Sequence, residues 1–454
     1  MTPLAHGIGG VRDLPVPESY FFVGAVIVLV VSFVALGALW TRPQLEQHGR
    51  GRPLSRPIDG ALRSRALRVL LQAASAGLLV VTVWAALWGT SLPLENFAPT
   101  FIYVIFWLGL PLLSILFGDV WRVLSPWRAI ADLAVWLLEL RGREARPLFA
   151  YPPRLGRYPA AVALFAFVAL ELAHPRPADP RVLGIAAALY SYWALAGMAV
   201  YGREPWTRGG EGFAAAFGLL ARIAPFGLRD DRIVLRWPFA GLGGADRFPG
   251  TLAVIAVLLG STSFDGFSRT TIWQDLLAEV RSGLVGASSP RVDLTISSVN
   301  LAGLLAFTLA VVFAYLAVVA LASRLVRMHT RALVPEFLLS LVPIAAAYTV
   351  AHYFSLFLIQ GQFLIPLASD PLGRDWNLFG TADFDPNLAI VSPETVWYVQ
   401  IGALVVGHVA GLAIAHDRAV ALFPRQADAL RSQGPMLVLM VLFTVGGMWL
   451  LSQG

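Results

Sequence analysis

The stretch YFFVGAVIVLVVSFVALGALW, at residues 20–40, decides the fold of this protein, because its 21 residues include no charged side chain. An α-helix rises about 1.5 Å per residue, so a helix of this length matches the roughly 30 Å hydrocarbon core of a bilayer. Inside lipid the backbone has to satisfy its own hydrogen bonds, and an α-helix does so within one segment. The stretch therefore predicts a membrane-spanning helix.

Nine further apolar runs follow along the chain. Together with the first run they predict one transmembrane domain over residues 1–454, an all-α helix bundle with about ten spans that has the lipid bilayer as its partner. Hydrophobic residues make up 57% of the chain and charged residues only 14%, which is too little charge to coat a soluble domain. The nine runs lie at residues 69–88, 101–116, 158–173, 182–201, 250–264, 294–321, 337–358, 396–414 and 436–451.

The arginines are divided unevenly between alternate loops, and this asymmetry predicts the orientation of the spans. Of the 34 basic residues, all of them arginine, 27 fall in every second loop, beginning with the loop after the first span. Cytoplasmic loops retain basic residues, so ten spans place both termini on the outer face. The first ten residues lack the basic cluster of a cleavable signal peptide. The composition is typical of a bacterial gene, and we expect a multi-pass protein of the bacterial plasma membrane.

The composition also excludes several classes of chemistry. Without cysteine the chain has no thiol nucleophile and no thiolate metal site, and without lysine it forms no Schiff base. No Gly-x-Ser-x-Gly motif occurs, so a serine hydrolase of that type is not expected. The arginines lie beside hydrophobic runs as topology signals, and we expect no nucleic-acid partner despite an isoelectric point near 9.9. Any metal would bind His, Asp and Glu.

Several segments between the spans are predicted to form helices, a hairpin or long outer loops. Residues 127–140 and 211–223 are predicted to be amphipathic helices along the inner interface. Residues 230–239 alternate enough to predict a short hairpin. Residues 265–293 and 368–393 are predicted outer loops, and the second of these is acidic, as a solvated loop or as a mouth that attracts cations.

Ionisable residues at membrane depth indicate a candidate site, because each one costs free energy to insert. Glu171, Asp265 and His352 all lie roughly 20 Å along their helices from the inner surface, and His174 follows Glu171 on the same helix face. These four residues predict an outward-facing site that binds a divalent metal ion or relays protons. The alternative is that the acids cap helix ends and that His352 only hydrogen-bonds to a neighbouring helix.

Further polar residues suggest a path toward the inner surface and a cover over the outer one. His408 lies deeper than His352, while His416 and Asp119 lie at the inner ends of their spans, so the three residues form a candidate polar path. The alternative for His408 is a closely packed side chain that bonds a carbonyl. His6 and Asp13 lie before the first span and are candidates for an outer lid, with a frayed terminus as the alternative.

Five strings give the chain a resemblance to a known family. Together they resemble the bacterial integral membrane family labelled as fenitrothion hydrolase components, over most of the chain. The resemblance implies a membrane protein that cleaves an aryl phosphorothioate triester as one subunit of a two-component enzyme, and it assigns no catalytic residues. The strings are HGIGGVRDLPVP (residues 6–17), FGDVWRVLSPWRA (117–129), SFDGFSRT (263–270), HYFSLFLIQGQ (352–362) and GHVAGLAIAHDRA (407–419).

Three functional hypotheses remain open at this point. The first is a metal-dependent hydrolase of an organophosphate-type ester at the outward-facing site, with or without a second membrane subunit. The second is an ion or proton-coupled transporter in which the same groups carry charge across the membrane. The third is a non-catalytic scaffold subunit whose buried polar groups hold helices together.

Overall fold

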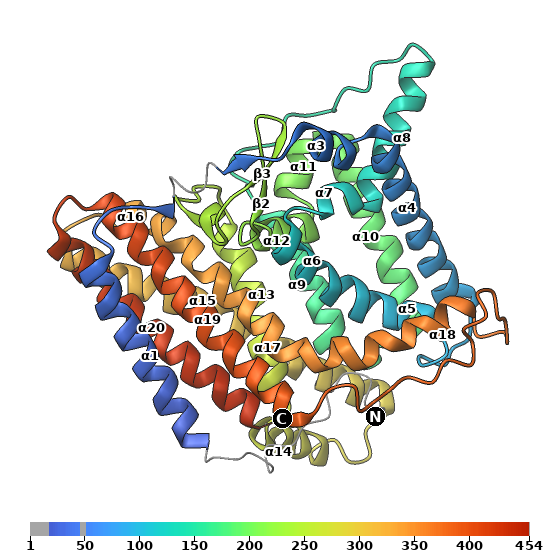
Figure 1. The fold of residues 1–454 in the computed structure, drawn as a ribbon. Coiled ribbons are helices and arrows are strands. Elements are labelled where there is room, and N and C mark those ends of the chain that lie inside the picture. The colour runs from blue at the N-terminus through green and yellow to red at the C-terminus, as the bar shows by residue number, and fades with distance from the viewer. Residues whose placement is uncertain (1–17, 46–50, 454) are drawn as a thin grey trace.

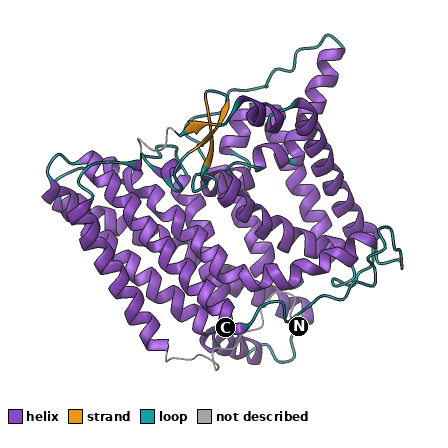
Figure 2. Ribbon diagram, in the orientation of Figure 1, coloured by secondary structure: helices purple, strands orange, loops and turns teal. Residues whose placement is uncertain are grey.

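The computed structural model describes residues 18–45 and 51–453 and shows an all-α bundle with one small sheet (Figure 2). In this part of the chain nine helical segments are long and apolar enough to cross a membrane. The tenth predicted span, Tyr158–Leu172, is an apolar helix of 15 residues. The prediction of a polytopic bundle with about ten spans is confirmed. The nine segments are Tyr20–Leu39, Arg56–Trp88, Phe97–Phe117, Pro180–Tyr201, Thr251–Ser268, Ser289–Leu325, Thr330–Ser369, Pro393–Leu422 and Gln426–Ser452.

The elements follow one another in chain order as labelled in Figure 1. The first helices are α1 (Glu18–Leu39), α3 (Arg56–Leu62), α4 (Arg65–Trp88), α5 (Phe97–Thr100), α6 (Leu110–Phe117), α7 (Trp121–Leu124), α8 (Pro126–Leu140), α9 (Tyr158–Leu172), α10 (Pro180–Tyr201), α11 (Arg203–Gly209) and α12 (Gly212–Leu220). The later helices are α13 (Thr251–Ser268), α14 (Thr271–Ser282), α15 (Ser289–Leu325), α16 (Thr330–Phe337), α17 (Val342–Gln360), α18 (Leu364–Ser369), α19 (Pro393–Leu422) and α20 (Gln426–Ser452). The strands are β1 (Arg52–Pro53), β2 (Phe226–Arg229) and β3 (Arg232–Leu235), η2 (Phe101–Gly109) is a π-helix, and η3 (Ala240–Leu242), η4 (Leu338–Leu341) and η5 (Gly361–Phe363) are 3-10 helices.

The segments between the spans separate to the two ends of the bundle (Figure 1). The elements α3, α7, α16 and the small sheet lie at one end, where the predicted inner loops belong. The elements α14 and α18 lie at the opposite end, where α1 begins and α20 ends. This arrangement is the alternation that the arginine distribution predicts.

The helices form two groups that meet in the middle of the bundle. In the first group α1 packs against α19 and α20, so the first span of the chain lies beside the last two (Figure 1). The same group contains α13, α15 and α17. In the second group α4 packs against α8 and α10, with α5, η2, α6, α9 and α12 beside them. Contacts of α13 with α9 and of α17 with η2 join the two groups.

Two glycines on α19 let it pack closely against α17 and against η4, the 3-10 helix that precedes α17. A Cβ added at Gly407 would lie 2.2 Å from the Cβ of Ala347, and one at Gly411 would lie 2.7 Å from the carbonyl oxygen of Ser340. Close approach at small residues is how helices gain van der Waals contact within lipid, where the hydrophobic effect between spans is absent. Glycine is therefore required at both positions.

The predicted hairpin is present with different bounds. Its strands are β2 and β3, and the turn between them is Asp230-Asp231, with φ of 48° and 57°. Two consecutive left-handed residues are what a type I′ hairpin turn needs, and aspartate tolerates that conformation better than most residues. The hairpin therefore begins before the predicted range, with its turn at the start of that range, and β1 adds a third strand beside β3.

Both predicted interface helices are present as helices, but only one of them lies at the edge of the bundle. The first is α8, which begins as predicted after Ser125. The Ser125 hydroxyl caps the helix by accepting a hydrogen bond from the backbone N–H of Arg128. The helix projects from its end of the bundle (Figure 1). The second is α12, where Phe213 and Phe217 are buried, so an interfacial position is wrong for this helix. Its sequence GFAAAFGLL is apolar on every side, and such a helix belongs in an interior.

The predicted outer loops differ from the structure in one case. Residues 265–293 are mostly helical, since α13 continues to Ser268, α14 follows, and α15 begins at Ser289. Residues 370–392 are irregular as predicted. Gln362 anchors that loop, because its side-chain amide donates to the carbonyl oxygen of Asn387 (3.1 Å) and its carbonyl accepts from the backbone N–H of Asn387 (3.0 Å).

Candidate functional site

Asp265 and His352, which the sequence places at the same depth, are in direct contact. Asp265 lies near the end of α13 and is 4% exposed. Its Oδ2 accepts hydrogen bonds from Nε2 of His352 (2.7 Å) and from the hydroxyl of Tyr353 (3.1 Å), two consecutive residues of α17. The buried carboxylate therefore fixes the orientation of the imidazole ring.

Arg269 completes the surroundings of Asp265, and sequence reasoning missed it. The guanidinium group, one turn further along the chain, donates from Nη2 to Oδ1 of Asp265 at 2.7 Å. A buried carboxylate needs a charged or hydrogen-bonding partner to offset the loss of water. The spacing of Asp265 and Arg269 could have revealed this pair, because residues four apart lie on the same face of a helix.

Glu171 lies at the edge of this cluster and His174 lies outside it. Glu171, in the last turn of α9, interacts electrostatically with both Asp265 and Arg269 and hydrogen-bonds to Trp107. The ring of His174 instead turns to the following loop, where Nδ1 accepts from the backbone N–H of Arg176 (3.1 Å). We call Asp265, Arg269, His352 and Tyr353 the acid–imidazole cluster.

A divalent metal ion at this cluster would have to compete with the hydrogen bonds that Asp265 already makes. Both oxygens of Asp265 already accept hydrogen bonds, one of them from a cationic guanidinium group. Among residues 18–45 and 51–453 no three His, Asp or Glu side chains converge in a way that could hold a metal. The divalent ion expected at Glu171, His174, Asp265 and His352 stays a prediction.

The three residues of the candidate polar path have separate partners. His408 is fully buried and Nδ1 donates to the carbonyl oxygen of Leu404 (2.7 Å), the close packing that was the alternative for this residue. Asp119 is exposed and accepts from the backbone N–H of Arg122 (3.3 Å). No chain of hydrogen bonds connects these residues to His416 within the described part of the protein.

His416 holds the segment after α1 in place. Nε2 donates to the carbonyl oxygen of Trp40 (2.9 Å), and Nδ1 lies 2.9 Å from Oε1 of Gln433. The neighbouring Asp417 accepts from the indole of Trp40 (3.0 Å) and from the backbone of Gln44 (2.5 Å). These contacts tie the first span to the last two. The candidate lid residues, His6 and Asp13, lie outside the described residues.

Buried ion pairs connect the helices at the arginine-rich end. Glu336 is 4% exposed and accepts from Arg247 (2.8 Å) and Arg418 (2.5 Å). A second network joins the starts of α9 and α13 and consists of Asp246, Arg157 (3.1 Å), Arg222 (2.9 Å) and Thr251. Burial raises the pKa of Asp246, but the two guanidinium groups outweigh it and hold the pKa below its ordinary value.

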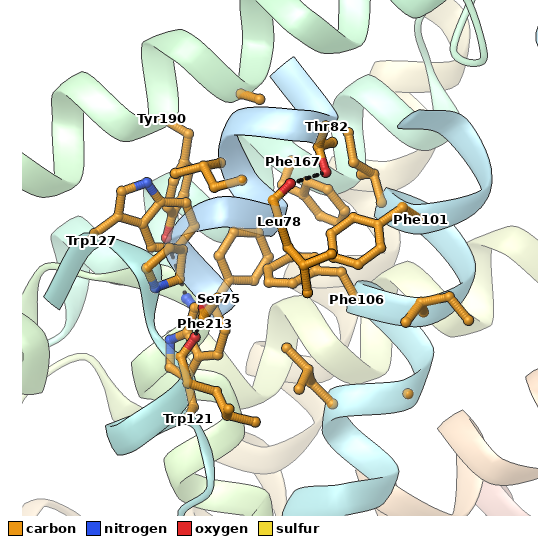
Figure 3. Close-up of a pocket in the computed structure, with 18 of the residues that line it drawn as sticks. Ser75, Leu78, Thr82, Phe101, Phe106, Trp121, Trp127, Phe167, Tyr190 and Phe213 are labelled. Atoms are coloured by element: carbon orange, nitrogen blue, oxygen red, sulfur yellow. Dashed lines mark hydrogen bonds between the residues drawn. The ribbon is translucent and has the colours of Figure 1, made fainter. Parts of the chain in front are cut away.

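A large apolar cavity lies within the second helix group. Its volume is about 1040 Å³, and its walls come from α4, η2, α6, α7, α8, α9, α10 and α12, with Phe357 of α17. Figure 3 shows the rings of Phe106, Trp121, Trp127 and Phe213 around it. Sequence reasoning missed this cavity, because apolar residues occur in every span and their pattern does not reveal which of them face an interior space.

The cavity adjoins the acid–imidazole cluster through two helices. Leu170 lines the cavity and precedes Glu171 on α9, and Phe357 lines it one turn after Tyr353 on α17. Trp107 stands between them, in contact with Glu171 and with its ring centroid 4.9 Å from that of Phe167, a cavity residue. The two features are therefore neighbours in the bundle.

Comparison with known proteins adds no relative to this picture: no family model, no curated protein and no solved structure matches the chain.

Proposed function

We propose that the protein is a membrane-embedded hydrolase in which the Asp265–His352 pair activates water for attack on a neutral, lipid-soluble ester. The observation that carries the proposal is the 2.7 Å contact between Oδ2 of Asp265 and Nε2 of His352. A carboxylate that orients an imidazole is the arrangement by which proteins prepare a general base. The reaction needs only residues of this chain.

The contact determines which imidazole nitrogen is basic. Because Asp265 accepts the hydrogen bond, Nε2 carries the proton and the lone pair lies on Nδ1. No hydrogen-bond partner of Nδ1 is found among the described residues, and 17% of the His352 side chain is exposed. Nδ1 is then free to take a proton from a water molecule.

The proposed reaction is balanced without an outside reagent. A water proton moves to Nδ1 of His352 while the water oxygen forms a bond to phosphorus. The bond from phosphorus to the aryloxy oxygen breaks, and the leaving group departs with the electron pair. Asp265 stabilises the imidazolium until Nδ1 gives its proton to the departing aryloxide or to a solvent water, while Arg269 and Tyr353 hold the carboxylate in place.

Two arguments support an aryl phosphorothioate triester as the substrate: its route to the site through the bilayer, and the resemblance of the sequence to the family described above. A neutral aryl phosphorothioate triester dissolves in lipid and reaches a site inside the bundle from the bilayer. The strings that carry the resemblance include all four residues of the acid–imidazole cluster, in SFDGFSRT and HYFSLFLIQGQ, but not Glu171. We therefore assign the base to His352 and no catalytic step to Glu171.

The test is release of nitrophenolate from a 4-nitrophenyl phosphorothioate triester by the purified full chain in lipid nanodiscs. General base catalysis contributes about 10²–10⁴-fold, so His352→Gln should lose activity by that factor. His329→Gln, an exposed histidine at the arginine-rich end, is the matched control and should keep full activity. Added imidazole should restore part of the activity of His352→Ala, which a merely structural role would not allow.

Two results would overturn the proposal. One is a His352→Gln protein that cleaves the triester as fast as the wild type. The other is a folded wild-type protein that cleaves no triester while moving protons across a liposome membrane, which would favour a transporter. Treatment with a chelator separates this mechanism from a metal-dependent one, because only the metal-dependent reaction would stop.

A further inference from the structure

We propose that the cavity between α4, η2, α9 and α10 is a binding site for a neutral, lipid-soluble molecule with an aromatic body. This inference does not depend on the proposed hydrolysis. The volume of about 1040 Å³ is at the upper end of small-molecule sites in proteins. Several of its lining residues, among them Leu113 and Leu189, are also exposed at the surface of the bundle, so a molecule dissolved in the bilayer can enter it.

The walls select against a polar or charged occupant. Among the residues that the structure describes, no charged side chain lines the cavity. Every hydroxyl and indole N–H group on its walls already donates to an acceptor in the protein, so a ligand finds no hydrogen-bond donor there and has to be neutral and mostly hydrocarbon. These six donors are Ser75 to the carbonyl oxygen of Leu124, Thr82 to Leu78, Trp121 to Glu211, Trp127 to Ser191, Tyr190 to Glu211 and Trp193 to Gly210.

The aromatic walls favour rings over a straight acyl chain. The rings of Phe106 and Phe213 meet edge to face at 4.6 Å, and the ring of Trp127 lies 4.8 Å from that of Tyr190 (Figure 3). Aromatic pairs gain free energy beyond the area they bury when another ring takes the open face or edge. A saturated acyl chain could fill the cavity, but it would not gain the free energy of contact between aromatic rings.

A buried carboxylate beneath the cavity holds these rings in position. Glu211 is fully buried, caps α12 through the backbone N–H groups of Phe213 and Ala214, and accepts from the indole of Trp121 (2.9 Å) and the hydroxyl of Tyr190. Side chains that are locked by hydrogen bonds lose little entropy when a ligand binds. Glu211 is thus a positioning residue for the aromatic wall.

The test uses 1-bromonaphthalene as the probe and tryptophan fluorescence as the signal, with the full chain in nanodiscs of saturated phospholipid. Bromine quenches nearby tryptophans, and three tryptophans line the cavity, so we expect saturable quenching. Ala187→Phe fills the cavity and should weaken the apparent affinity at least tenfold. Ala188→Phe, the next residue on α10, is exposed and not part of the lining, and should change nothing.

A second cavity variant and a control variant complete the experiment. Ala166→Phe fills the cavity from α9 and replaces Ala187→Phe if that variant does not fold. His352→Gln should bind the probe like the wild type, which separates this site from the proposed reaction. Quenching that does not saturate, or that Ala188→Phe weakens equally, would overturn the proposal. So would strong quenching by a dibrominated acyl chain of phosphatidylcholine that bromonaphthalene fails to displace, since the occupant would then be a bilayer lipid.

Discussion

The two helix groups of this protein differ in what fills the space between their helices. In the group around α13, α17 and α19, glycines bring backbones together, as at Gly407 and at Gly260, whose added Cβ would lie 2.6 Å from the Cα of Thr308. In the group around α4, η2 and α10, aromatic rings line a cavity of about 1040 Å³. The tight group therefore holds the acid–imidazole cluster among closely packed helices, while the open group leaves room for a ligand.

The buried charge in the tight group should give the largest effect. Asp265→Asn leaves the guanidinium of Arg269 without its carboxylate, and breaking a buried ion pair in this way costs about 3–5 kcal/mol. We expect loss of both stability and triester cleavage, measured by thermal unfolding and nitrophenolate release. Asp275→Asn on α14, an exposed aspartate at the same end, is the control. Equal stability of the two variants would show that the cluster does not hold this group together.

Overpacking at the glycine contact should come next. Gly407→Ala places a methyl group against Ala347 and the carbonyl oxygen of Pro343, which should cost about 2–3 kcal/mol. Gly402→Ala, on the same helix with no heavy atom within 4 Å of the added Cβ, should gain up to about 1 kcal/mol. Thermal unfolding in detergent compares the two. A Gly407→Ala protein as stable as Gly402→Ala would disprove tight packing between α17 and α19.

The ion pairs that join the two groups should give a smaller effect that depends on pH. The folded-state pKa of Asp246 lies below its ordinary value of about 3.9, so its stabilisation is complete above that pH and is lost as the pH falls through the folded-state pKa. Asp246→Asn should remove about 2 kcal/mol near neutral pH and flatten the acid limb of the stability curve. The measurement is the free energy of unfolding of both proteins between pH 2 and 6. If stability fell with pH as steeply in Asp246→Asn as in the wild type, Asp246 would not have this role.

Filling the open group should have the smallest effect on stability. Ala187→Phe adds a ring to a space that accommodates it, so the free energy of unfolding should change by less than about 1 kcal/mol. The measurement is thermal unfolding beside Ala188→Phe, with no probe present. A large loss of stability would mean that the space around Ala187 is filled in the folded protein, and the contrast between the two groups would fail.

Part of the candidate site could be predicted from the sequence. Counting residues along two apolar runs placed Asp265 and His352 at the same depth, because a helix has a fixed rise. The same count could not give the rotation of each helix about its axis. It therefore grouped His174 with Glu171, although the structure turns His174 toward Arg176, and it missed Arg269. It also read 211–223 as an interface helix, because burial depends on neighbours distant in the chain.

By itself the sequence determined the spans, the helical class and the alternation of arginine-rich loops. These features follow from local properties, namely the length and hydropathy of each segment and the charge of the loops beside it. Only the folded structure shows that α1 lies beside α19 and α20, that Asp265 contacts His352 and Arg269, and that aromatic rings line a cavity. These features depend on which helix faces meet, and packing between segments far apart in the chain sets those faces.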